Sequence, residues 1–317
     1  MQVLEGLKIL TGNAHVALAE EVCKYLEKPL GKADVFKFQN DNTFVQIREN
    51  VRSHDVFIIQ PTCSPTNDNL MELLIMIDAA KRASAGRITA VMPYYGYGRT
   101  DKKDQPRVPI TGRLVADLIT VAGAQRMLTM DLHAGQIQGF FNIPVDELSA
   151  LYILSNYFRD KVTKDWVVVA VDIGISKRAR DLAEELGVPL AIIEKRRIGN
   201  EDKIETVSVI GDVKGRTALL FDDEIDTGGT ITSAAAALQT SGAKEVYACT
   251  THPIFSGGAV QKLQQSPIID IIATNTVPVT SESLNGKITV LSISSLIGEA
   301  IHRIHNHMSV GAMFEKR

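Results

Sequence analysis

The sequence predicts an α/β fold built from two domains, each with a mainly parallel sheet flanked by helices. The chain has 317 residues, and domains of roughly 100–200 residues are the norm. Short runs rich in Val and Ile alternate with longer segments of helical periodicity along the whole chain. Several of these runs, such as Val167–Val171, are apolar throughout, as expected for strands that are buried on both faces of a parallel sheet.

The strands are predicted where apolar residues form short runs bounded by turn residues. In chain order the predicted strands are Leu7–Thr11, Val56–Gln60, Ile88–Met92, Met127–Asp131, Val167–Val171, Leu190–Glu194, Thr206–Ile210, Ala218–Asp222, Glu245–Thr250, Ile268–Thr274 and Ile288–Leu291.

Helices are predicted between the strands from a period of 3.6 residues. Asn67 is expected to cap the helix that begins at Asp68. Gly123, Gly187 and Gly242 follow the last turns of three helices, where a left-handed residue is favoured. The predicted helices are His15–Leu26, Asp68–Ala83, Thr111–Ala122, Ser149–Asp160, Arg178–Leu186, Ile231–Thr240, Gly257–Gln264 and Ser294–His307.

A domain boundary is expected near residues 142–150, because each half of the chain then starts with its own βα series. We therefore predict an N-terminal domain over residues 1–148 and a C-terminal domain over residues 149–317. The two halves resemble one another, since each contains strands that lead into acidic and glycine residues.

The composition is that of a folded globular chain. Hydrophobic residues make up 45% and charged residues 22% of the sequence, which excludes an intrinsically disordered protein. The 34 basic and 37 acidic residues give a net charge of −3, so a nucleic-acid binder of the basic-patch kind is not expected. Aromatic residues make up only 6%, which gives little support for a platform that stacks single strands.

Cysteine usage and hydropathy indicate a cytoplasmic protein. Cys23, Cys63 and Cys249 lie far apart and form no CxxC pair, which excludes a disulfide framework or a cysteine zinc site and fits a reducing compartment. The N-terminus shows no signal-peptide pattern. The longest apolar runs are far shorter than the roughly 20 residues of a membrane-spanning helix, so no membrane partner is expected.

The strongest motif joins acidic, glycine and threonine residues at the end of a predicted strand. Glycines let a backbone approach an anion, and the free N–H groups at a helix start favour a phosphate. Carboxylates at the carboxyl ends of the strands in an open sheet can accept hydrogen bonds from sugar hydroxyls or metal-bound water. The alternative is an ordinary turn with an acidic cap. The motif reads Asp222-Asp223-Glu224-Ile225-Asp226-Thr227-Gly228-Gly229-Thr230.

A second motif is a charged run after the Tyr- and Gly-rich turn Tyr94–Gly98. It has no apolar face and predicts a mobile loop. Its basic residues suit a segment that closes over a polyphosphate. By itself the run favours a solvated surface loop, so both interpretations stay open. The run is Arg99, Thr100, Asp101, Lys102, Lys103, Asp104, Gln105, Pro106 and Arg107.

Four further residues follow predicted strands at their carboxyl ends. His133 and Asp172 would make a pair suited to Mg²⁺ that keeps several waters, although His133 taken alone is more often structural. Lys195 and Arg197 leave a buried strand, and either stabilise phosphoryl charge or are plain surface charge.

Three histidines, His302, His305 and His307, lie on the last predicted helix. They have no partner ligands at a suitable spacing for a metal, so we expect them on the surface.

Together these motifs resemble those of the ribose-phosphate diphosphokinase family, the phosphoribosyl diphosphate (PRPP) synthetases. The similarity covers essentially the whole chain. One sequence string, Phe221–Thr230, resembles the phosphoribosyl-binding loop that the family shares with phosphoribosyltransferases, whereas the other matching strings are specific to the synthetases. The strings that carry the resemblance are Asn67–Ile77, Arg99–Arg107, Met130–Phe141, Asp172–Arg178 and Phe221–Thr230.

The resemblance implies two tandem phosphoribosyltransferase-type domains and a diphosphokinase reaction. The β,γ-diphosphoryl group of ATP would be transferred to the C1 hydroxyl of ribose 5-phosphate, which gives PRPP and AMP for nucleotide biosynthesis. Mg²⁺ is the implied cofactor. The resemblance also implies self-association, commonly as a hexamer arranged as a trimer of dimers.

The resemblance further implies roles for the residues that match the family's motifs. Lys195 and Arg197 would stabilise the moving diphosphoryl group, and His133 and Asp172 would be linked to Mg²⁺. The ribose 5-phosphate site would comprise Asp222, Asp223, Asp226, Thr227, Gly228, Gly229 and Thr230. The ATP site would comprise Phe38, Asn40, Asn42, Arg99, Thr100, Asp101, Lys102 and Lys103. Phe38 and its neighbours match an adenine-binding segment that an adjacent subunit contributes in the family.

Three positions depart from the family's pattern. Asn42 stands where the adenine segment usually has an acidic residue, and its amide oxygen can still accept a hydrogen bond from the adenine amino group. Asn50 and Gly311 stand where the family often has Ser, in a region that resembles the effector site of the phosphate-activated class. Activation by phosphate and inhibition by ADP therefore do not carry over from the resemblance.

Two other functions are compatible with this fold. A non-catalytic associated subunit would be expected to have lost charged residues at the site, whereas the charged positions named above are all present. A phosphoribosyltransferase would consume PRPP, which the Asp226–Thr230 loop permits. The duplicated domain and the Arg99–Arg107 loop disfavour that alternative.

Overall fold

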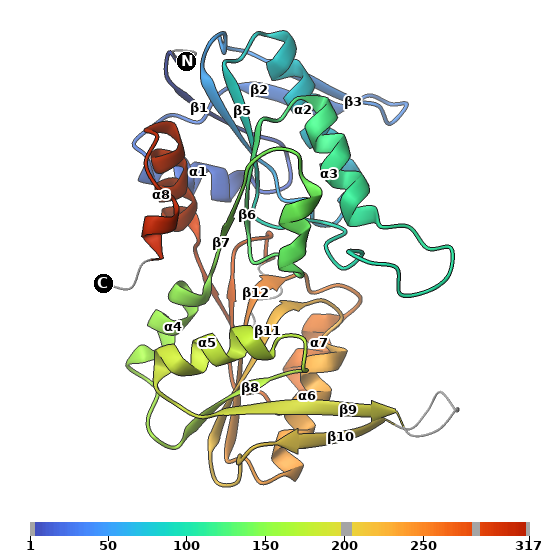
Figure 1. Ribbon diagram of the computed structural model, residues 1–317, viewed down its shortest axis with the longest axis vertical. Coiled ribbons are helices and arrows are strands. Elements are labelled where there is room, and N and C mark those ends of the chain that lie inside the picture. The colour runs from blue at the N-terminus through green and yellow to red at the C-terminus, as the bar shows by residue number, and fades with distance from the viewer. Residues whose placement is uncertain (1–3, 198–204, 281–285, 315–317) are drawn as a thin grey trace. The chain divides into compact units, whose positions relative to one another are not determined.

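The computed structural model describes residues 4–197, 205–280 and 286–314, without the side chains of residues 195–197 and 205–207. The chain divides into two compact units, and Figure 1 colours the chain by residue number. The first unit runs to Ser149 and also includes Thr276–Pro278 and the segment from Ser292 onward. The second unit comprises Ala150–Asn275 and Val279–Leu291. The domain boundary after residue 148 stays a prediction.

The first unit is built on a five-stranded parallel sheet in the order β1-β4-β5-β6-β7. A two-stranded antiparallel hairpin, β2–β3, is separate from that sheet. The strands are β1 (Leu7–Thr11), β2 (Ala33–Lys37), β3 (Thr43–Ile47), β4 (Asp55–Ile59), β5 (Arg87–Met92), β6 (Arg126–Met130) and β7 (Val145–Leu148). The helices are α1 (Val16–Tyr25), α2 (Thr66–Arg82), α3 (Thr111–Ala122), α8 (Ser294–His305) and the short 3₁₀ helices η1 (Gly135–Phe140) and η3 (Gly311–Met313).

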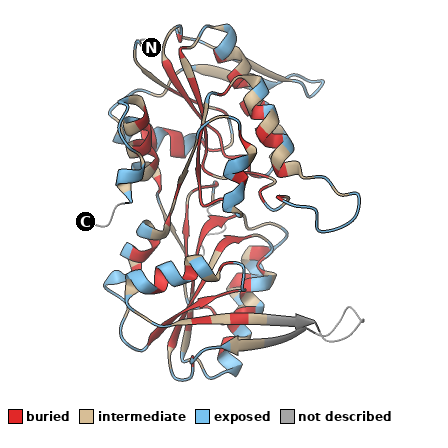
Figure 2. Cartoon of the chain, in the orientation of Figure 1, coloured by how far each residue is buried: buried red, intermediate tan, exposed pale blue. Residues whose placement is uncertain are grey.

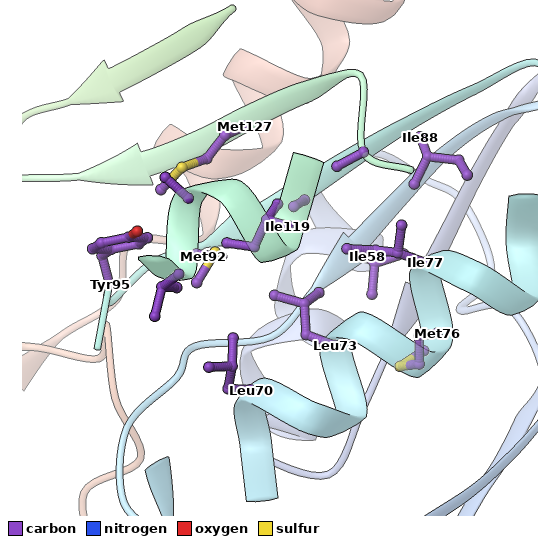
Figure 3. Packing of buried hydrophobic residues seen from close by; sticks show 14 of the residues in the cluster. Ile58, Leu70, Leu73, Met76, Ile77, Ile88, Met92, Tyr95, Ile119 and Met127 are labelled. Atoms are coloured by element: carbon purple, nitrogen blue, oxygen red, sulfur yellow. The ribbon is translucent and has the colours of Figure 1, made fainter. Parts of the chain in front are cut away.

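The core of the first unit lies between the sheet and helices α2 and α3 (Figure 3). Leu73 and Ile77 of α2 are fully buried against Ile58 of β4. Ile119 of α3 and Met92 of β5 belong to the same buried cluster. Apolar residues recur along α2 at helical spacing, so one face of the helix is buried. Lys81 and Arg82 are exposed, whereas Glu72 is buried with the apolar residues.

The second unit has a seven-stranded sheet in the order β10-β9-β8-β11-β12-β13-β14. All neighbouring strands are parallel except β9 and β10, which are antiparallel. The strands are β8 (Trp166–Ala170), β9 (Leu190–Arg197), β10 (Glu205–Ile210), β11 (Thr217–Ile225), β12 (Glu245–Pro253), β13 (Ile271–Thr274) and β14 (Ile288–Leu291). The helices are α4 (Leu151–Arg159), α5 (Ser176–Leu186), α6 (Gly229–Thr240) and α7 (Ala259–Gln265).

The predicted α/β fold class is confirmed, because each unit contains a mainly parallel sheet flanked by helices. Figure 2 shows that the central strands are buried, as their continuous apolar runs predict. Strands β2, β3 and β7 were not predicted. The hairpin strands are half-exposed, and β7 is a four-residue strand with two acidic residues, so neither shows a clear buried run.

Two helices that lie next to predicted functional residues, α2 and α6, begin at residues other than those predicted. Helix α2 begins at Thr66, so Asn67 lies inside its first turn and the predicted cap at Asn67 is wrong. Helix α6 begins at Gly229, two residues before the predicted start. The predicted helix ends at glycine are confirmed for α3 and α5, since Gly123 and Gly187 are their C-cap residues and have positive φ.

Cys23, Cys63 and Cys249 are free and buried. Burial raises the pKa of the Cys23 and Cys63 thiols to about 11, so both are protonated and unreactive at neutral pH. Within residues 4–314, apart from the gaps given above, no helix is long and apolar enough to span a bilayer.

Helix α8 corrects the prediction for one of the three C-terminal histidines. His302 and His307 are exposed, but the ring nitrogen Nδ1 of His305 lies 2.9 Å from Oδ2 of Asp55. Asp55 is fully buried and also pairs with the guanidinium of Arg87, whose Nε lies 2.8 Å from Oδ1. His305 is therefore part of a polar cluster around the buried Asp55 carboxylate that joins α8 to the sheet of the first unit.

Candidate active site

In the first unit, the charged loop leaves the carboxyl end of β5 and returns at the start of α3 (Figure 1). The Gly112 N–H closes the base of the loop, because it donates to the carbonyl and hydroxyl oxygens of Thr100, each at 3.2 Å. The buried Tyr95 hydroxyl donates to the Gly112 carbonyl at 2.7 Å. Lys102 and Lys103 are exposed. The loop therefore combines an anchored base with cations that face solvent.

The turn before this loop is held tightly against its neighbours. The Gly96 N–H donates to Oγ1 of Thr62 at 2.7 Å, and a side chain at Gly96 would come within 2.4 Å of the Thr62 carbonyl oxygen. Only glycine fits so close an approach. Tyr97 has a φ of +66°, and its hydroxyl donates to Oδ1 of Asn67 on α2. These contacts fix where the charged loop begins.

His133 lies beside the base of the charged loop. A side chain at Gly98 would come within 3.7 Å of Cβ of His133, and the exposed Arg99 is the next residue along the chain. Asp131, two residues before His133, is buried and has a φ of +37°. A non-glycine residue adopts such a conformation only where the surrounding structure imposes it. Two motifs that were predicted separately are thus neighbours in the first unit.

The predicted adenine segment forms the tip of the β2–β3 hairpin. The Phe38 N–H donates to the Asn42 carbonyl at 2.9 Å, and Oδ1 of Asn40 accepts from the Asn42 N–H at 3.2 Å. Phe38 is 50% exposed although it packs edge-on against Phe36 and Phe44, with ring centroids 5.3 and 5.5 Å away. An exposed aromatic face next to amide groups can stack on a planar base and bond its edge.

In the second unit, three carboxylates converge at the carboxyl ends of β8 and β11. Strand β11 continues to Ile225, although its pairing with β8 ends at Phe221. Burial and the neighbouring charges of Asp223 and Asp172 raise the pKa of Asp222 well above its usual range. Crowded carboxylates of this kind favour a ligand that brings hydrogen-bond donors or a cation.

The predicted phosphate loop follows these carboxylates and starts helix α6. Gly228 precedes the helix with a φ of +76°, a left-handed conformation that suits glycine. The N–H groups of the first turn, from Gly229 onward, have no acceptor within the helix. Thr227 and Thr230 are exposed on either side of the glycine pair. This arrangement offers backbone and hydroxyl donors to an anion at the positive end of a helix dipole.

Two residues that sequence reasoning missed support this loop from the segment 256–262. The Ser256 hydroxyl donates to Oδ1 of Asp226, and Nζ of Lys262 donates to the Thr227 carbonyl at 3.3 Å. Both lie about 30 or more positions from the loop in sequence, so no local spacing pattern could have identified them.

The catalytic cations predicted from the sequence are placed only by their backbone. Lys195 and Arg197 lie on β9, where Lys195 is opposite Val207 of β10 and Arg197 is opposite Glu205. Their side chains lie outside the described part of the chain, so their catalytic roles stay predictions.

No group of three or more His, Cys, Asp or Glu side chains is arranged to hold a metal ion in the part of the chain that the structure describes. His133 belongs to the first unit and Asp172 to the second, and their pairing stays a prediction. Mg²⁺ commonly takes only one or two carboxylates and completes its shell with water and substrate phosphates. Asp172, with the crowded Asp222 and Asp223 near it, fits that pattern.

Comparison with family models gives two matches within the chain. Residues 7–123 match the N-terminal domain of ribose phosphate pyrophosphokinase. Residues 200–315 match the phosphoribosyl synthetase-associated domain.

Similar proteins cover nearly the full length of this chain. A ribose-phosphate pyrophosphokinase from Caldanaerobacter subterraneus subsp. tengcongensis is 53% identical over 310 residues, which are 98% of each protein. One from Clostridium acetobutylicum is 51% identical over 314 residues, again 98% of each. The crystal structure of phosphoribosylpyrophosphate synthetase from Mycobacterium smegmatis has a TM-score of 0.90 and 43% identity, over 96% of this chain and 100% of that chain.

Proposed function

The chain belongs to the ribose-phosphate pyrophosphokinase family, and we propose that it transfers the β,γ-diphosphoryl group of ATP to the C1 hydroxyl of ribose 5-phosphate. The products are PRPP and AMP, which serve nucleotide biosynthesis. The observation that carries this proposal is the glycine loop at the start of α6 beside the Asp222 and Asp223 carboxylates. This is the chemistry needed to hold a phosphorylated sugar.

We assign ribose 5-phosphate to the second unit. The N–H groups that follow Gly228 and the hydroxyls of Thr227 and Thr230 would bind the 5-phosphate. Asp222 and Asp223 would accept hydrogen bonds from the ribose hydroxyls. Each carboxylate already accepts one backbone N–H, and sugar hydroxyls would supply further donors, so binding would relieve part of their mutual repulsion.

We assign ATP to the first unit, supported by its exposed aromatic hairpin and its cationic loop. Adenine would stack on Phe38, with Asn40 and Asn42 at its edge. The triphosphate carries negative charge that the basic loop neutralises. The loop cations assigned to this site are Arg99, Lys102 and Lys103, and Thr100 and Asp101, which the family resemblance also places there, form the base of the loop that carries them.

The cofactor that we assign is Mg²⁺, held by Asp172 and His133 together with water and substrate oxygens. When bound, it would supply charge neutralisation to the diphosphoryl oxygens. One oxygen of the Asp172 carboxylate already has a local partner, because Oδ1 accepts a hydrogen bond of 3.1 Å from the Ile175 N–H at the start of α5. That bond fixes the orientation of the carboxylate.

The chain's own contribution to the transfer is positioning and charge neutralisation. The C1 oxygen of the ribose forms a bond to the β-phosphorus, the bond between that phosphorus and the bridging α,β-oxygen breaks, and AMP leaves. The proton of the C1 hydroxyl passes to water. Lys195 and Arg197 would stabilise the charge on the diphosphoryl group during this exchange.

Replacement of Lys195 tests that role. Lys195→Ala should lower kcat by about a hundredfold or more, since one positioned charge contributes on the order of 2.7–4 kcal/mol to such a barrier. Ribose 5-phosphate should still bind, because its proposed site does not use Lys195. Initial rates and calorimetric titration measure the two quantities, and a near-normal kcat would remove Lys195 from the mechanism.

The proposed function is tested by incubating the purified protein with ATP, ribose 5-phosphate and Mg²⁺ and separating the nucleotides. AMP and PRPP should form in equal amounts, and neither should form without the sugar phosphate. Binding of both substrates without AMP would instead indicate a non-catalytic associated subunit. Formation of a nucleotide from PRPP and a nucleobase, without ATP, would indicate a phosphoribosyltransferase.

We further propose a cytoplasmic homo-oligomer, with a hexamer as the specific expectation. Large apolar side chains are exposed along one face of α3, where Leu114 is 54% and Val121 77% exposed, and at Phe38 on the hairpin. Apolar surface of this kind is commonly covered by another chain. Sedimentation velocity at several protein concentrations measures the assembly, and a monomer at all of them would contradict the proposal.

A further inference from the structure

Asp101 differs from the rest of the charged loop in its surroundings. The residues from Lys102 to Arg107 are exposed, whereas Asp101 is only 8% exposed. Its Oδ2 accepts a hydrogen bond of 2.8 Å from Nε2 of Gln136. A carboxylate that is removed from water at the foot of a cationic loop needs such a donor.

Gln136 belongs to η1, the short helix that packs on the base of the loop. Ile137 of η1 is fully buried, and a side chain at Gly98 would come within 3.9 Å of its Cδ1. A side chain at Gly112 would likewise come within 3.7 Å of Phe140. Because η1 follows His133 by only two residues, the Asp101–Gln136 bond connects the charged loop to the segment that carries His133.

The position of Asp101 disfavours a direct contact with the nucleotide. Its carboxylate is negative, as a triphosphate is, and one of its oxygens already accepts from Gln136. A hydrogen bond to a buried carboxylate is among the stronger ones in proteins. It is therefore suited to hold the loop in one orientation.

We propose that Asp101 and Gln136 form a latch that positions the charged loop, so that Arg99, Lys102 and Lys103 are held beside His133. Asp101 and Gln136 are then positioning residues and not ligands of the nucleotide. The proposal rests on the proposed function for its kinetic consequence only. Its structural consequence, an ordered loop base, holds whether or not the protein is a diphosphokinase.

Limited trypsin digestion measures the order of the loop without substrate, because Lys102 and Lys103 are cleavage sites. Gln136→Leu removes the donor, and Q136E opposes the Asp101 carboxylate with a second one. Both variants should be cleaved after these lysines about tenfold faster than the wild type, as expected for the loss of one charge-assisted bond. Mass spectrometry identifies the cleaved bonds.

Kinetic measurements distinguish a positioning role of Gln136 from a general loss of folded structure in the variants. In both variants kcat/KM for ATP should fall about tenfold, while the dissociation constant of ribose 5-phosphate stays within about twofold of the wild-type value. The matched control is Q138E, on the same short helix. It disturbs the bond of 2.5 Å between Nε2 of Gln138 and Oε2 of Glu147 and should leave the loop cleavage rate unchanged.

A double variant that exchanges the carboxylate and the amide between positions 101 and 136 gives the decisive comparison. In D101N/Q136E the amide of residue 101 can donate to the new carboxylate, so cleavage resistance and kcat/KM for ATP should both recover relative to Q136E. If the double variant is as impaired in ATP use as Q136E, the charge of Asp101 acts on the nucleotide directly and the latch is wrong. Wild-type cleavage rates in Q136L and Q136E would also overturn it.

The two proposals fail in different ways. If the wild type forms no AMP, the proposed function is wrong, and the cleavage rates of the wild type and the four variants still decide the latch. If the wild type forms AMP and cleavage is unaffected by both Gln136 variants, only the latch is wrong. Far-UV circular dichroism identifies a variant that has not folded. If Q136L or Q136E is unfolded, the other of the two variants is used for the test.

Discussion

Asp222, which we propose to bind ribose, illustrates how such a residue can lower the stability of the protein without its ligand. Burial and the charges of Asp223 and Asp172 raise the pKa of Asp222 well above its usual range. At pH values below the ordinary aspartate pKa, both the folded and the unfolded states are protonated at this site and it contributes nothing. As the pH rises above that value, the unfolded state ionises first, so the folded state loses stability until the raised pKa is passed.

Asp222→Asn should therefore increase the free energy of unfolding at neutral pH, and the difference from the wild type should vanish at acidic pH. Asparagine keeps the oxygen that accepts the Asp223 N–H at 3.0 Å. Urea unfolding at several pH values measures the effect. The exposed Asp212→Asn variant is the control and should change little. Lower stability of Asp222→Asn at neutral pH would contradict the pKa direction.

The same Asp222→Asn substitution should weaken ribose 5-phosphate binding by about tenfold, because a charge-assisted hydrogen bond to a sugar hydroxyl is replaced by a neutral one. Calorimetric titration measures the affinity. A residue that stabilises the fold when it is replaced, yet is needed for binding, is typical of a functional site. Unchanged affinity would place the ribose hydroxyls elsewhere.

At the scale of single elements, the start of helix α6 depends on backbone conformation. Gly228 has a φ of +76°, and Gly215 has a φ of +72° in a turn away from the predicted binding residues. A side chain at Gly215 meets nothing within 4 Å, and at Gly228 the nearest atoms are 3.6 Å away. Both positions therefore have space for a methyl group but disfavour any residue with a Cβ.

Gly228→Ala and Gly215→Ala should both lower the free energy of unfolding by about 1–2 kcal/mol. Only Gly228→Ala should also weaken ribose 5-phosphate binding, because the strained turn would move the N–H groups that we propose to bind the phosphate. Urea unfolding and calorimetric titration are the two measurements. Equal loss of affinity in both variants would show that the effect comes from stability and not from the loop.

The hairpin β2–β3 shows where prediction from sequence was limited at the element scale. Its strands contain apolar residues, but none of its ten positions is fully buried. The hairpin is held to the first unit by contacts from distant segments. The Asn13 amide donates to the Val35 carbonyl at 3.2 Å, and Nζ of Lys37 pairs with Asp68 of α2 at 2.9 Å. Such contacts leave no periodic pattern in the hairpin's own sequence.

At the scale of the whole molecule, the C-terminal helix α8 clusters with the first unit and not with the residues that precede it in sequence. His305 and Asp55, which are 250 positions apart, make direct contact, and Arg87 also donates to the Ile304 carbonyl at 3.0 Å. Ile297 and Ile301 of α8 are fully buried. The helix thus packs against α1, where a side chain at Gly298 would come within 2.3 Å of Tyr25, and its last turn is joined to the sheet by the polar contacts around the buried Asp55.

Asp55→Ala should lower the free energy of unfolding of the protein by about 3–5 kcal/mol, because it leaves the half-buried Arg87 guanidinium without the fully buried carboxylate that pairs with it. The control is Asp146→Ala, which removes the partner of Arg126 in a more exposed ion pair of the same sheet. Its loss should be clearly smaller. Urea unfolding compares the two variants, and equal losses would contradict a special role for the buried cluster.

The candidate site was largely predictable where its chemistry is local in sequence. The string from Asp222 to Thr230 combines acids, glycines and threonines next to a buried strand, and the structure places them at a strand end and a helix start. Gln136 and Ser256 were not predicted as functional. Each acts through one hydrogen bond to a residue about 30 or more positions away, and such pairings arise only when the chain folds.

By itself, the sequence determined the α/β class, most strands and helices, and the charged and glycine residues for which we propose phosphate binding, because these follow from short-range patterns of apolar, glycine and charged residues. The tertiary structure alone decided that His133 lies beside the loop base, that Asp101 is buried against Gln136, and that α8 completes the first unit. These features depend on contacts between distant segments, and the free energy of such contacts is set by burial and packing, which no local pattern encodes.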